Sequence, residues 1–269
     1  MSLPELMLTA RHPSVSSTDD DSRALISRSM TMSDSGKILA LWSTPRSRST
    51  SFAKMMAQRG DHNVVVEPFE SSAYRSAQKV VWRYEESNVE FNYDRVFGRL
   101  VASLRQAPLF IKDHAYYINH LATPEFLDSF THSFIIRHPR DALPSGHDKW
   151  PDKSLKEVGY LEQAELFDKV VRHTGVIPPV VDADDLVQAP QAITQAYCER
   201  VGITFVPQAL SWDENPNERS IWHQQLAKTT GFVSTESRYV AIEDDERLKF
   251  LYTVCLPPYE RLYRHRIKV

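Results

Sequence analysis

The segment spanning residues 38–52 (ILALWSTPRSRSTSF) most restricts how this chain can fold. An apolar run, residues 38–42, ends at Ser43, and a Pro-Arg-Ser-Arg-Ser-Thr stretch leads into helix-like sequence that Gly60 closes. A strand that turns into the start of a helix presents free backbone N–H groups and the positive end of the helix dipole. Hydroxyls and arginines at such a turn suit a phosphate or sulfate group, so we expect a phosphorylated nucleotide to bind here.

The rest of the chain alternates short apolar runs with stretches of helical periodicity. The apolar runs are mostly continuous, which is typical of strands buried on both faces. Strands alternating with helices predict an α/β fold in which helices flank a parallel sheet. We expect strands at residues 38–43, 63–66, 109–112, 133–137 and 179–182. We expect helices at residues 50–58, 93–105, 124–129, 142–147, 155–173, 190–201 and 244–264, the last broken near Pro257 and Pro258.

The first 36 residues differ in composition from the rest of the chain. Ser, Thr and Asp recur through them, and they show no charged start followed by an apolar core, as a secretory signal would. Such a composition buries little apolar surface, so we expect residues 1–36 to form a disordered tail. Residues 37–269 are then expected to form a single α/β domain.

Charge and cysteine content narrow the class of protein. The formal net charge is −3, from 32 Lys and Arg against 35 Asp and Glu, which argues against a general nucleic-acid binder. No apolar stretch approaches the length of a membrane span, so no membrane partner is expected. Cys198 and Cys255 have no paired spacing, which predicts neither a disulfide framework nor a zinc site. A reducing, cytoplasmic location fits this pattern.

Three of the expected strands end in residues whose side chains carry a positive charge, a hydroxyl or an imidazole. Ligands of α/β sheets collect at the carboxyl ends of the strands, so the three ends are expected to form one site. Each pattern alone also fits a bland reading: a surface loop, a hydrogen-bonded histidine or an ion pair at a helix start. The residues concerned are Pro45, Arg46, Ser47, Arg48, Ser49 and Thr50 after the first strand, Lys112 and His114 at the third, and Arg137 with Ser145 after the fourth.

These elements resemble those of the sulfotransferases that use 3′-phosphoadenosine-5′-phosphosulfate (PAPS). The family pattern Pro-[Lys/Arg]-Ser-x-[Ser/Thr]-Thr, which holds the 5′-phosphosulfate, is matched by residues 45–50. The pattern Arg-x-Pro-[Arg/Lys]-Asp with a later Ser, which grips the 3′-phosphate, is matched by Arg137 and Ser145. A Lys-x-His element, which supplies the catalytic histidine, is matched by Lys112 and His114. The resemblance covers residues 37 to about 232 and implies the P-loop-like sulfotransferase fold.

The resemblance implies a reaction and a set of roles. PAPS is the co-substrate, a hydroxyl or amine of a small molecule is the acceptor, and no metal is needed. His114 is expected to take the acceptor's proton, with His223 a weaker rival. Arg46 and Lys112 are expected to stabilise the charge that grows on the leaving phosphate oxygen. Asp113 points away from His114 by strand alternation and is interpreted as structural.

The chain also departs from the family pattern. Arg48 stands where the loop usually has Gly, Ala183 stands where a tyrosine often lies near the adenine, and the C-terminal Arg-Lys-Gly-type clamp is missing. The nearest segment to that clamp is residues 222–232, WHQQLAKTTGF. These departures indicate a distant bacterial or fungal-type branch and leave the adenosine contacts open.

Three alternatives remain open at the level of sequence. A P-loop kinase is disfavoured because G-x-x-x-x-G-K-[ST] is absent, although Asp182 and Asp184 could serve as metal ligands. A sulfotransferase-like enzyme with a changed reaction would keep the same residues, and a binding protein would have no need of Lys112 and His114. The acceptor cannot be identified from sequence. Aromatic residues that could contact it or equally form core are Tyr116, Tyr117, Trp82, Tyr84 and Phe91.

Overall fold

The computed structural model describes residues 36–214, 229–233 and 240–269. The expected N-terminal tail, apart from Gly36, lies outside the described residues. So do His223 and most of the segment 222–232 that takes the place of the family's C-terminal clamp.

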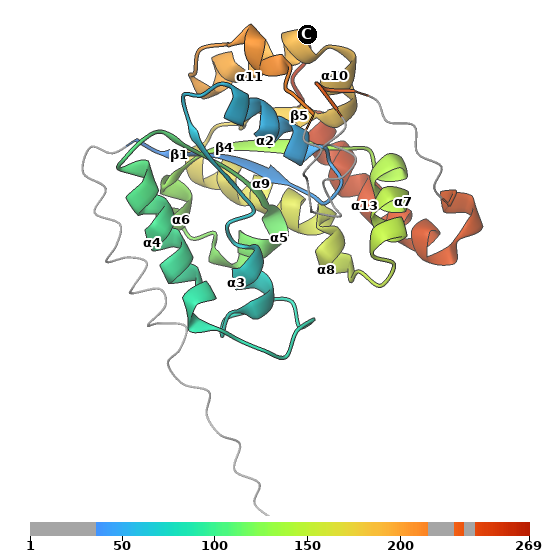
Figure 1. Ribbon diagram of the computed structural model, residues 1–269. Coiled ribbons are helices and arrows are strands. Elements are labelled where there is room, and N and C mark those ends of the chain that lie inside the picture. Colours follow the sequence, from blue (N-terminus) through green and yellow to red (C-terminus); the bar gives the residue numbers. More distant parts are fainter. Residues whose placement is uncertain (1–35, 215–228, 234–239) are drawn as a thin grey trace, which may run out of the picture.

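A five-stranded parallel sheet lies at the centre of the described structure (Figure 1). Its strand order is β2-β3-β1-β4-β5, so the first strand is also the central one. On either side of it, Leu39 of β1 pairs with Phe110 of β3 and with Thr131 of β4. The strands are β1 (Ile38–Ser43), β2 (Asn63–Val66), β3 (Leu109–His114), β4 (Phe130–Ile136) and β5 (Val180–Asp182). The prediction of a parallel α/β sheet is confirmed.

Helices cover both faces of the sheet, and the alternation along β1 separates two cores. Leu39 and Leu41 face the core formed with α2 (Ser49–Gln58), α10 (Ala183–Gln188) and α11 (Pro190–Val201), which lie above the sheet in Figure 1. Ile38, Ala40 and Trp42 face the larger core on the other side. Its helices are α3 (Glu70–Arg75), α4 (Tyr93–Leu104), α5 (Ala115–Ile118), α6 (Pro124–Asp128), α7 (Pro139–Lys149), α9 (Tyr160–Thr174) and α13 (Glu246–Tyr263). Short 3-10 turns lie at Val89–Phe91, Asn119–Leu121, Pro207–Leu210 and Ile242–Asp244.

The helix expected at residues 155–173 is in fact two helices. The first is α8 (Leu155–Val158), and Gly159 at φ 82° separates it from α9. That left-handed conformation ends one helix and redirects the next, and glycine adopts it without steric cost. A Cβ at this position would lie 3.2 Å from Cδ1 of Tyr116 and 3.6 Å from Cδ of Pro45, so the break also brings the chain against the β1–α2 loop.

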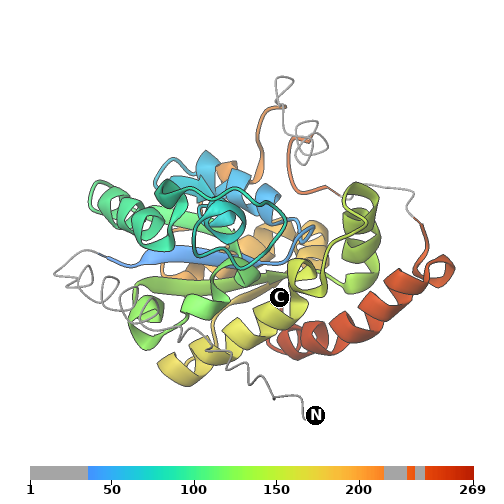
Figure 2. The same cartoon turned by 90° about the horizontal axis from the view of Figure 1, so that it is seen from below.

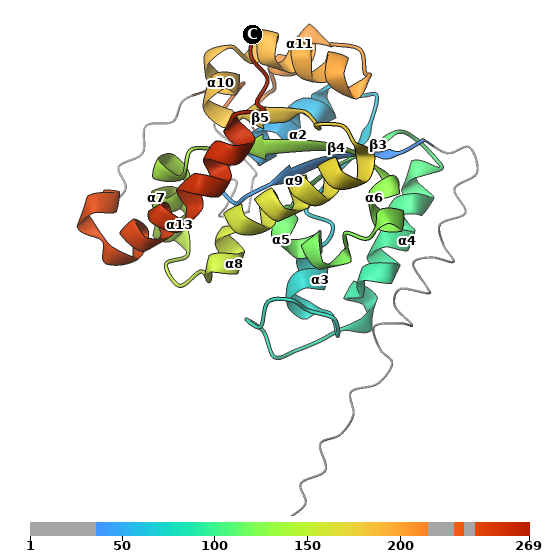
Figure 3. The ribbon, with the colours of Figure 1, turned by 180° about the vertical axis from the view of Figure 1, so that it is seen from behind.

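The break expected near Pro257 and Pro258 was wrong. Helix α13 runs from Glu246 to Tyr263 with both prolines inside it. Proline removes a backbone donor and usually bends or ends a helix. Here the helix buries Leu248, Cys255 and other side chains of one face, and packs on α9 and α7, as Figure 3 shows from behind. Tertiary packing outweighs the local cost.

Other boundaries differ by a few residues. Strand β3 continues through His114, two residues beyond the expected end, because Asp113 and His114 still pair with β1. Helix α7 begins at Pro139, where proline fits the first turn because no backbone donor is needed there. Across the described ranges, no helix combines the length and apolar character needed to cross a membrane.

Candidate active site

The loop between β1 and α2 is held in a strained shape without glycine. Arg46 (φ 66°) and Arg48 (φ 62°) both adopt the left-handed conformation, which non-glycine residues rarely do and which marks functional loops. The Ser47 hydroxyl is buried and donates to the carbonyl oxygen of Thr44 at 2.7 Å. Ser47 therefore braces the loop from inside, and an anion at the start of α2 would meet backbone N–H groups of the helix's first turn, which begins at Ser49 and Thr50.

The expected donor-site residues of β1 and β4 lie together. Arg46 Nε donates to the hydroxyl of Ser145 on α7 at 3.0 Å. Arg137, just after β4, donates through Nη1 to the carbonyl oxygen of Arg46 at 3.1 Å. Arg46, Ser145 and Arg137, although more than ninety positions separate Arg46 from the other two, thus form one wall of the candidate site. This contact follows from the topology, since β1 and β4 are neighbours in the sheet.

This wall has an excess of positive charge. Burial, and next the nearby Arg137, lower the pKa of Arg48. The Nε atoms of Arg48 and Arg137 are buried, and neither finds a hydrogen-bond acceptor among the described residues. A buried donor without a partner costs free energy, and one guanidinium beside another costs more. An anion with several oxygens would remove both costs.

A second cluster lies at the ends of β2 and β3. Lys112 Nζ forms an ion pair with Oε1 of Glu67, the residue that follows β2. The same oxygen lies 3.4 Å from Nε2 of His114. Glu67 has φ 52°, a third non-glycine residue in the left-handed conformation. Sequence reasoning missed Glu67; the available signal was an acidic residue directly after the strand expected at 63–66.

Ser43 and Glu67 flank the two nitrogen atoms of the His114 ring. The Ser43 hydroxyl donates its one proton to the carbonyl oxygen of Asp113 at 3.0 Å, and its oxygen lies 2.9 Å from Nδ1 of His114. The direction of the contact between Ser43 and Nδ1 depends on the tautomer of the ring, and the Nε2 edge faces Glu67. Burial, and next the charge of Lys112, lower the pKa of His114 to about 3. The imidazole is therefore neutral at physiological pH.

Aromatic and acidic neighbours fix the histidine further. Tyr116 stacks on the His114 ring at a centroid distance of 5.7 Å, and Tyr117 is also buried beside it. Asp113 is fully buried and accepts from the backbone N–H of Phe69 at 3.0 Å and of His114 at 2.7 Å, which fits its structural interpretation. Trp82, by contrast, is 82% exposed and belongs to no core.

One of the two carboxylates considered as metal ligands, that of Asp182, serves the fold. Asp182 caps α10 by accepting from the N–H groups of Asp184 (3.0 Å) and Asp185 (3.2 Å), and it also accepts from Tyr259. Among the residues that the structure describes, no cluster of three or more His, Cys, Asp or Glu could hold a metal ion.

Comparison with known proteins gives a consistent family. The family model "Sulfotransferase domain" matches residues 36–263. Branched-chain-amino-acid aminotransferase-like protein 2 of Arabidopsis thaliana is 27% identical over 209 residues, which are 74% of this chain and 37% of that protein. Sulfotransferase ppzF of Metarhizium majus (strain ARSEF 297) is 26% identical over 156 residues, which are 47% of this chain and 45% of that protein. This chain therefore spans less than half the length of these curated relatives.

Solved structures of low sequence identity align with most of the chain. The sulfotransferase domain from the curacin biosynthetic pathway aligns over 81% of this chain and 96% of its own, with a TM-score of 0.46 and 13% identity. The sulfotransferase domain from the Synechococcus PCC 7002 olefin synthase covers 83% of this chain and 96% of its own, with a TM-score of 0.43 and 12% identity.

Proposed function

The chain belongs to the sulfotransferase domain family, and on that premise we propose that it moves a sulfuryl group from PAPS to a hydroxyl or amine of a small-molecule acceptor. One observation carries the proposal: Arg46, Arg48 and Arg137 converge where β1 and β4 end, and two of these guanidinium groups have buried donors without an acceptor among the described residues. PAPS carries negative charge at both its 5′ and 3′ positions, which matches such a site.

The donor is proposed to lie across the β1–α2 loop. The amides at the start of α2 and the side chain of Arg46 would bind the 5′-phosphosulfate, with Pro45, Ser47, Arg48, Ser49 and Thr50 shaping the loop. Arg137 and Ser145 would bind the 3′-phosphate, for which an ATP site has no use. Arginine suits this task because its planar fork can bind two oxygens at once.

Sulfuryl transfer is then an in-line displacement at sulfur. A new bond forms between the acceptor oxygen or nitrogen and sulfur, while the bond from sulfur to the phosphate oxygen breaks. The electron pair goes to the leaving 3′-phosphoadenosine-5′-phosphate (PAP), where Arg46 and Lys112 would stabilise the charge. Positive side chains can supply this field without a metal ion.

His114 is the proposed base, through Nε2. In the tautomer with the proton on Nδ1, beside the Ser43 oxygen, Nε2 would have its lone pair available, and the low pKa keeps the ring neutral near neutral pH. A base of such low pKa needs help once it holds the proton. Glu67, whose Oε1 lies 3.4 Å from Nε2, would stabilise the imidazolium and share its charge with Lys112.

Nucleotide selectivity tests the proposal. The unmodified protein should bind PAP much more tightly than AMP in calorimetry. Arg137→Ala should remove most of the difference, because one charge-assisted contact is worth about 1.5–3 kcal/mol, or tenfold to a hundredfold in affinity. Arg140→Ala is the matched control: it lies in the same motif but is exposed and paired with Glu243. Equal binding of PAP and AMP by the unmodified protein would refute the proposal.

Activity in the presence of a metal chelator distinguishes a sulfotransferase from a P-loop kinase. A sulfotransferase with this site should keep its activity in excess chelator, since no step calls for a metal. A P-loop kinase would lose activity and recover it with magnesium.

A further inference from the structure

A cavity lies beside the β1–α2 loop, between α7, α8 and α13. Its volume is about 380 Å³, the open space at its mouth included. One face of α7 forms a wall through Leu143, Gly146 and Trp150, and Val158 and Leu251 close the other sides. Most of the lining is apolar.

The charged part of the lining is cationic. Arg46, Lys153 and Arg247 line the cavity, and the lining residues, all of them described, include no Asp or Glu. His147 also lines it and lies 3.6 Å from Asp245 outside the wall. An apolar cavity with several cations and no acidic group in its wall favours a ligand that has an apolar body and an anionic group.

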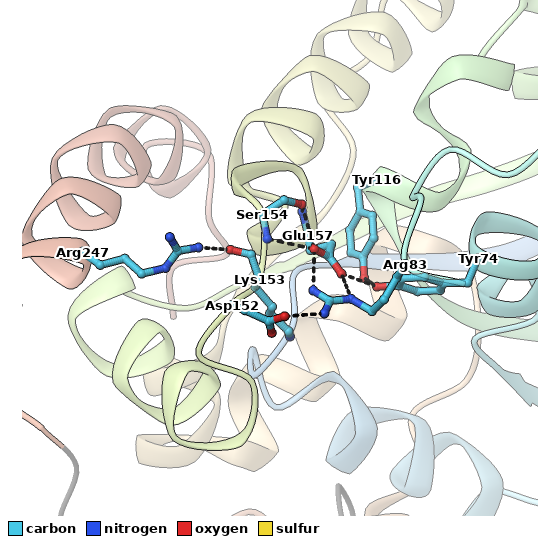
Figure 4. A network of polar contacts seen from close by, with 8 residues as sticks. All are labelled: Tyr74, Arg83, Tyr116, Asp152, Lys153, Ser154, Glu157 and Arg247. Carbon is cyan, nitrogen blue, oxygen red and sulfur yellow. Dashed lines mark hydrogen bonds and ion pairs between the residues drawn. The ribbon is translucent and has the colours of Figure 1, made fainter. Parts of the chain in front are cut away.

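The surroundings of Lys153 hold this residue in place. Its side chain is buried, and Arg247 of α13 donates to its carbonyl oxygen (Figure 4). Its amine lies 5.3 Å from the centre of the Trp150 ring, and the nearby Arg83 binds Asp152 at 2.8 Å and Glu157 at 2.9 Å. Figure 4 shows this network, with Glu157 also accepting from Ser154, Arg83 and Tyr74.

The cavity shares a wall with the proposed donor site. Arg46, which contacts Ser145 of the donor site, forms part of the cavity wall. Lys153 also lies within electrostatic reach of both Arg46 and Glu67. A molecule in the cavity would thus have one end at Arg46 and the other between α8 and α13.

Resting on the function proposed above, we propose that this cavity is the acceptor site and that it selects acceptors carrying a carboxylate or a similar anionic group on an apolar body. Lys153 would bind the anionic group, with Arg247 toward the solvent side. The acceptor's hydroxyl or amine would then face Nε2 of His114.

The ionisation of Lys153 gives the preference a pH signature. Burial is the main cause that lowers the pKa of this amine, to about 8. The preference for anionic acceptors should therefore be full below pH 8 and fall above it, as Lys153 loses its proton. The charged groups that face Lys153 from the surrounding elements are Glu157, Arg46, Glu67 and Arg83. Arg247 is also close, because its guanidinium donates to the carbonyl oxygen of Lys153.

Matched pairs of probes test the proposal on the PAP-saturated protein. We would compare 8-hydroxyoctanoate with 1,8-octanediol, and 3-(4-hydroxyphenyl)propionate with 4-(3-hydroxypropyl)phenol, by calorimetry at pH 7 and at pH 9.5. The carboxylates should bind tighter at pH 7 by roughly tenfold or more, the range for one charge-assisted contact. Lys153→Gln should remove most of this preference and leave the neutral probes unaffected. Lys149→Gln, which removes an exposed positive charge near the end of α7, should keep it.

The outcomes separate this proposal from the one on which it rests. Tight PAP binding with equal affinity for charged and neutral probes would overturn the acceptor proposal and leave the sulfotransferase function standing. Failure to bind PAP would refute the proposed function. Binding of the probe pairs in the absence of nucleotide would still test whether the cavity prefers anionic ligands. If Lys153→Gln does not fold, Arg247→Gln and the pH series decide: a preference unchanged in both overturns the proposal.

Discussion

Replacing Ser43 by alanine should slow catalysis without abolishing nucleotide binding. The Ser43 oxygen lies 2.9 Å from Nδ1 of His114, and both residues are buried. In the resting enzyme this bond joins neutral groups and is worth about 1 kcal/mol. Once Nε2 takes the acceptor's proton the ring is cationic, and a charge-assisted bond is worth about 1.5–3 kcal/mol. The difference, about 0.5–2 kcal/mol, acts on the transition state.

That difference converts to a loss in turnover of about twofold to thirtyfold. The assay is steady-state turnover with PAPS, together with PAP affinity and melting temperature on the same sample. Ser43→Thr keeps the hydroxyl and should recover most of the rate. PAP affinity should change little, since the donor contacts come from the loop, Arg137 and Ser145.

A matched control separates catalysis from folding. Ser133 is also a buried serine in the sheet, and its hydroxyl donates to the carbonyl oxygen of Ala40 at 2.8 Å, away from the site. Ser133→Ala should lose stability comparably and keep its turnover. Turnover within twofold of normal in Ser43→Ala, or an equal loss in both variants, would show that Ser43 does not position the base.

Three further predictions test the base and the frame around it. His114→Ala should lower turnover by roughly a hundredfold to ten-thousandfold with PAP affinity nearly unchanged, and a parallel loss of stability and affinity would favour a structural role. His132 accepts a hydrogen bond from Trp42 through Nδ1 at 2.9 Å, and burial is the main cause that lowers its pKa to about 4. Below pH 6.5 the unfolded state therefore binds more protons than the folded state, so the free energy of unfolding falls as the pH drops toward 4. Urea unfolding at pH 7 and 4.5 should show a loss about 2–3 kcal/mol smaller in His132→Gln than in the unmodified protein, and equal losses would contradict this. Gly159→Ala should destabilise by at least about 1 kcal/mol more than Gly175→Ala, since both have positive φ but the Cβ at Gly175 meets no described atom within 4 Å; equal losses would mean that contact with the loop is unimportant.

The sheet could be predicted because the sequence signals for its strands are local. Continuous apolar runs mark buried strands, and each strand of the structure overlaps the one expected. The two helix errors have different causes. The break at Gly159 has a local signal, a glycine in the left-handed conformation shortly after the capping box of Ser154 and Glu157, which helical periodicity does not register. The continuity of α13 past Pro257 depends on its packing against α9 and α7, which periodicity cannot recover.

The site was predictable in part for a similar reason. Motifs at strand ends identify Arg46, Arg137 and Ser145 before any fold is known, and the sheet brings these three together. Ser43 and Glu67 were not found because their importance lies in contacts with β3, far away along the chain. The donor and acceptor tasks that we assign to all these side chains stay predictions.

The position of β1 explains why the proposed nucleotide contacts and the proposed base come from different sides of the sheet's centre. It is the central strand, with β4 on one side and β3, then β2, on the other. Figures 1 and 2 show β1 in blue within the sheet, with helices on both faces. Arg137 and α7 follow β4, so the proposed nucleotide contacts gather on that side. Glu67 and His114 end β2 and β3, so the proposed proton acceptor lies on the opposite side. The acceptor cavity proposed above lies against α7, on the side of the nucleotide contacts, so an in-line displacement would require the acceptor to reach past Arg46 and the end of β1 toward His114.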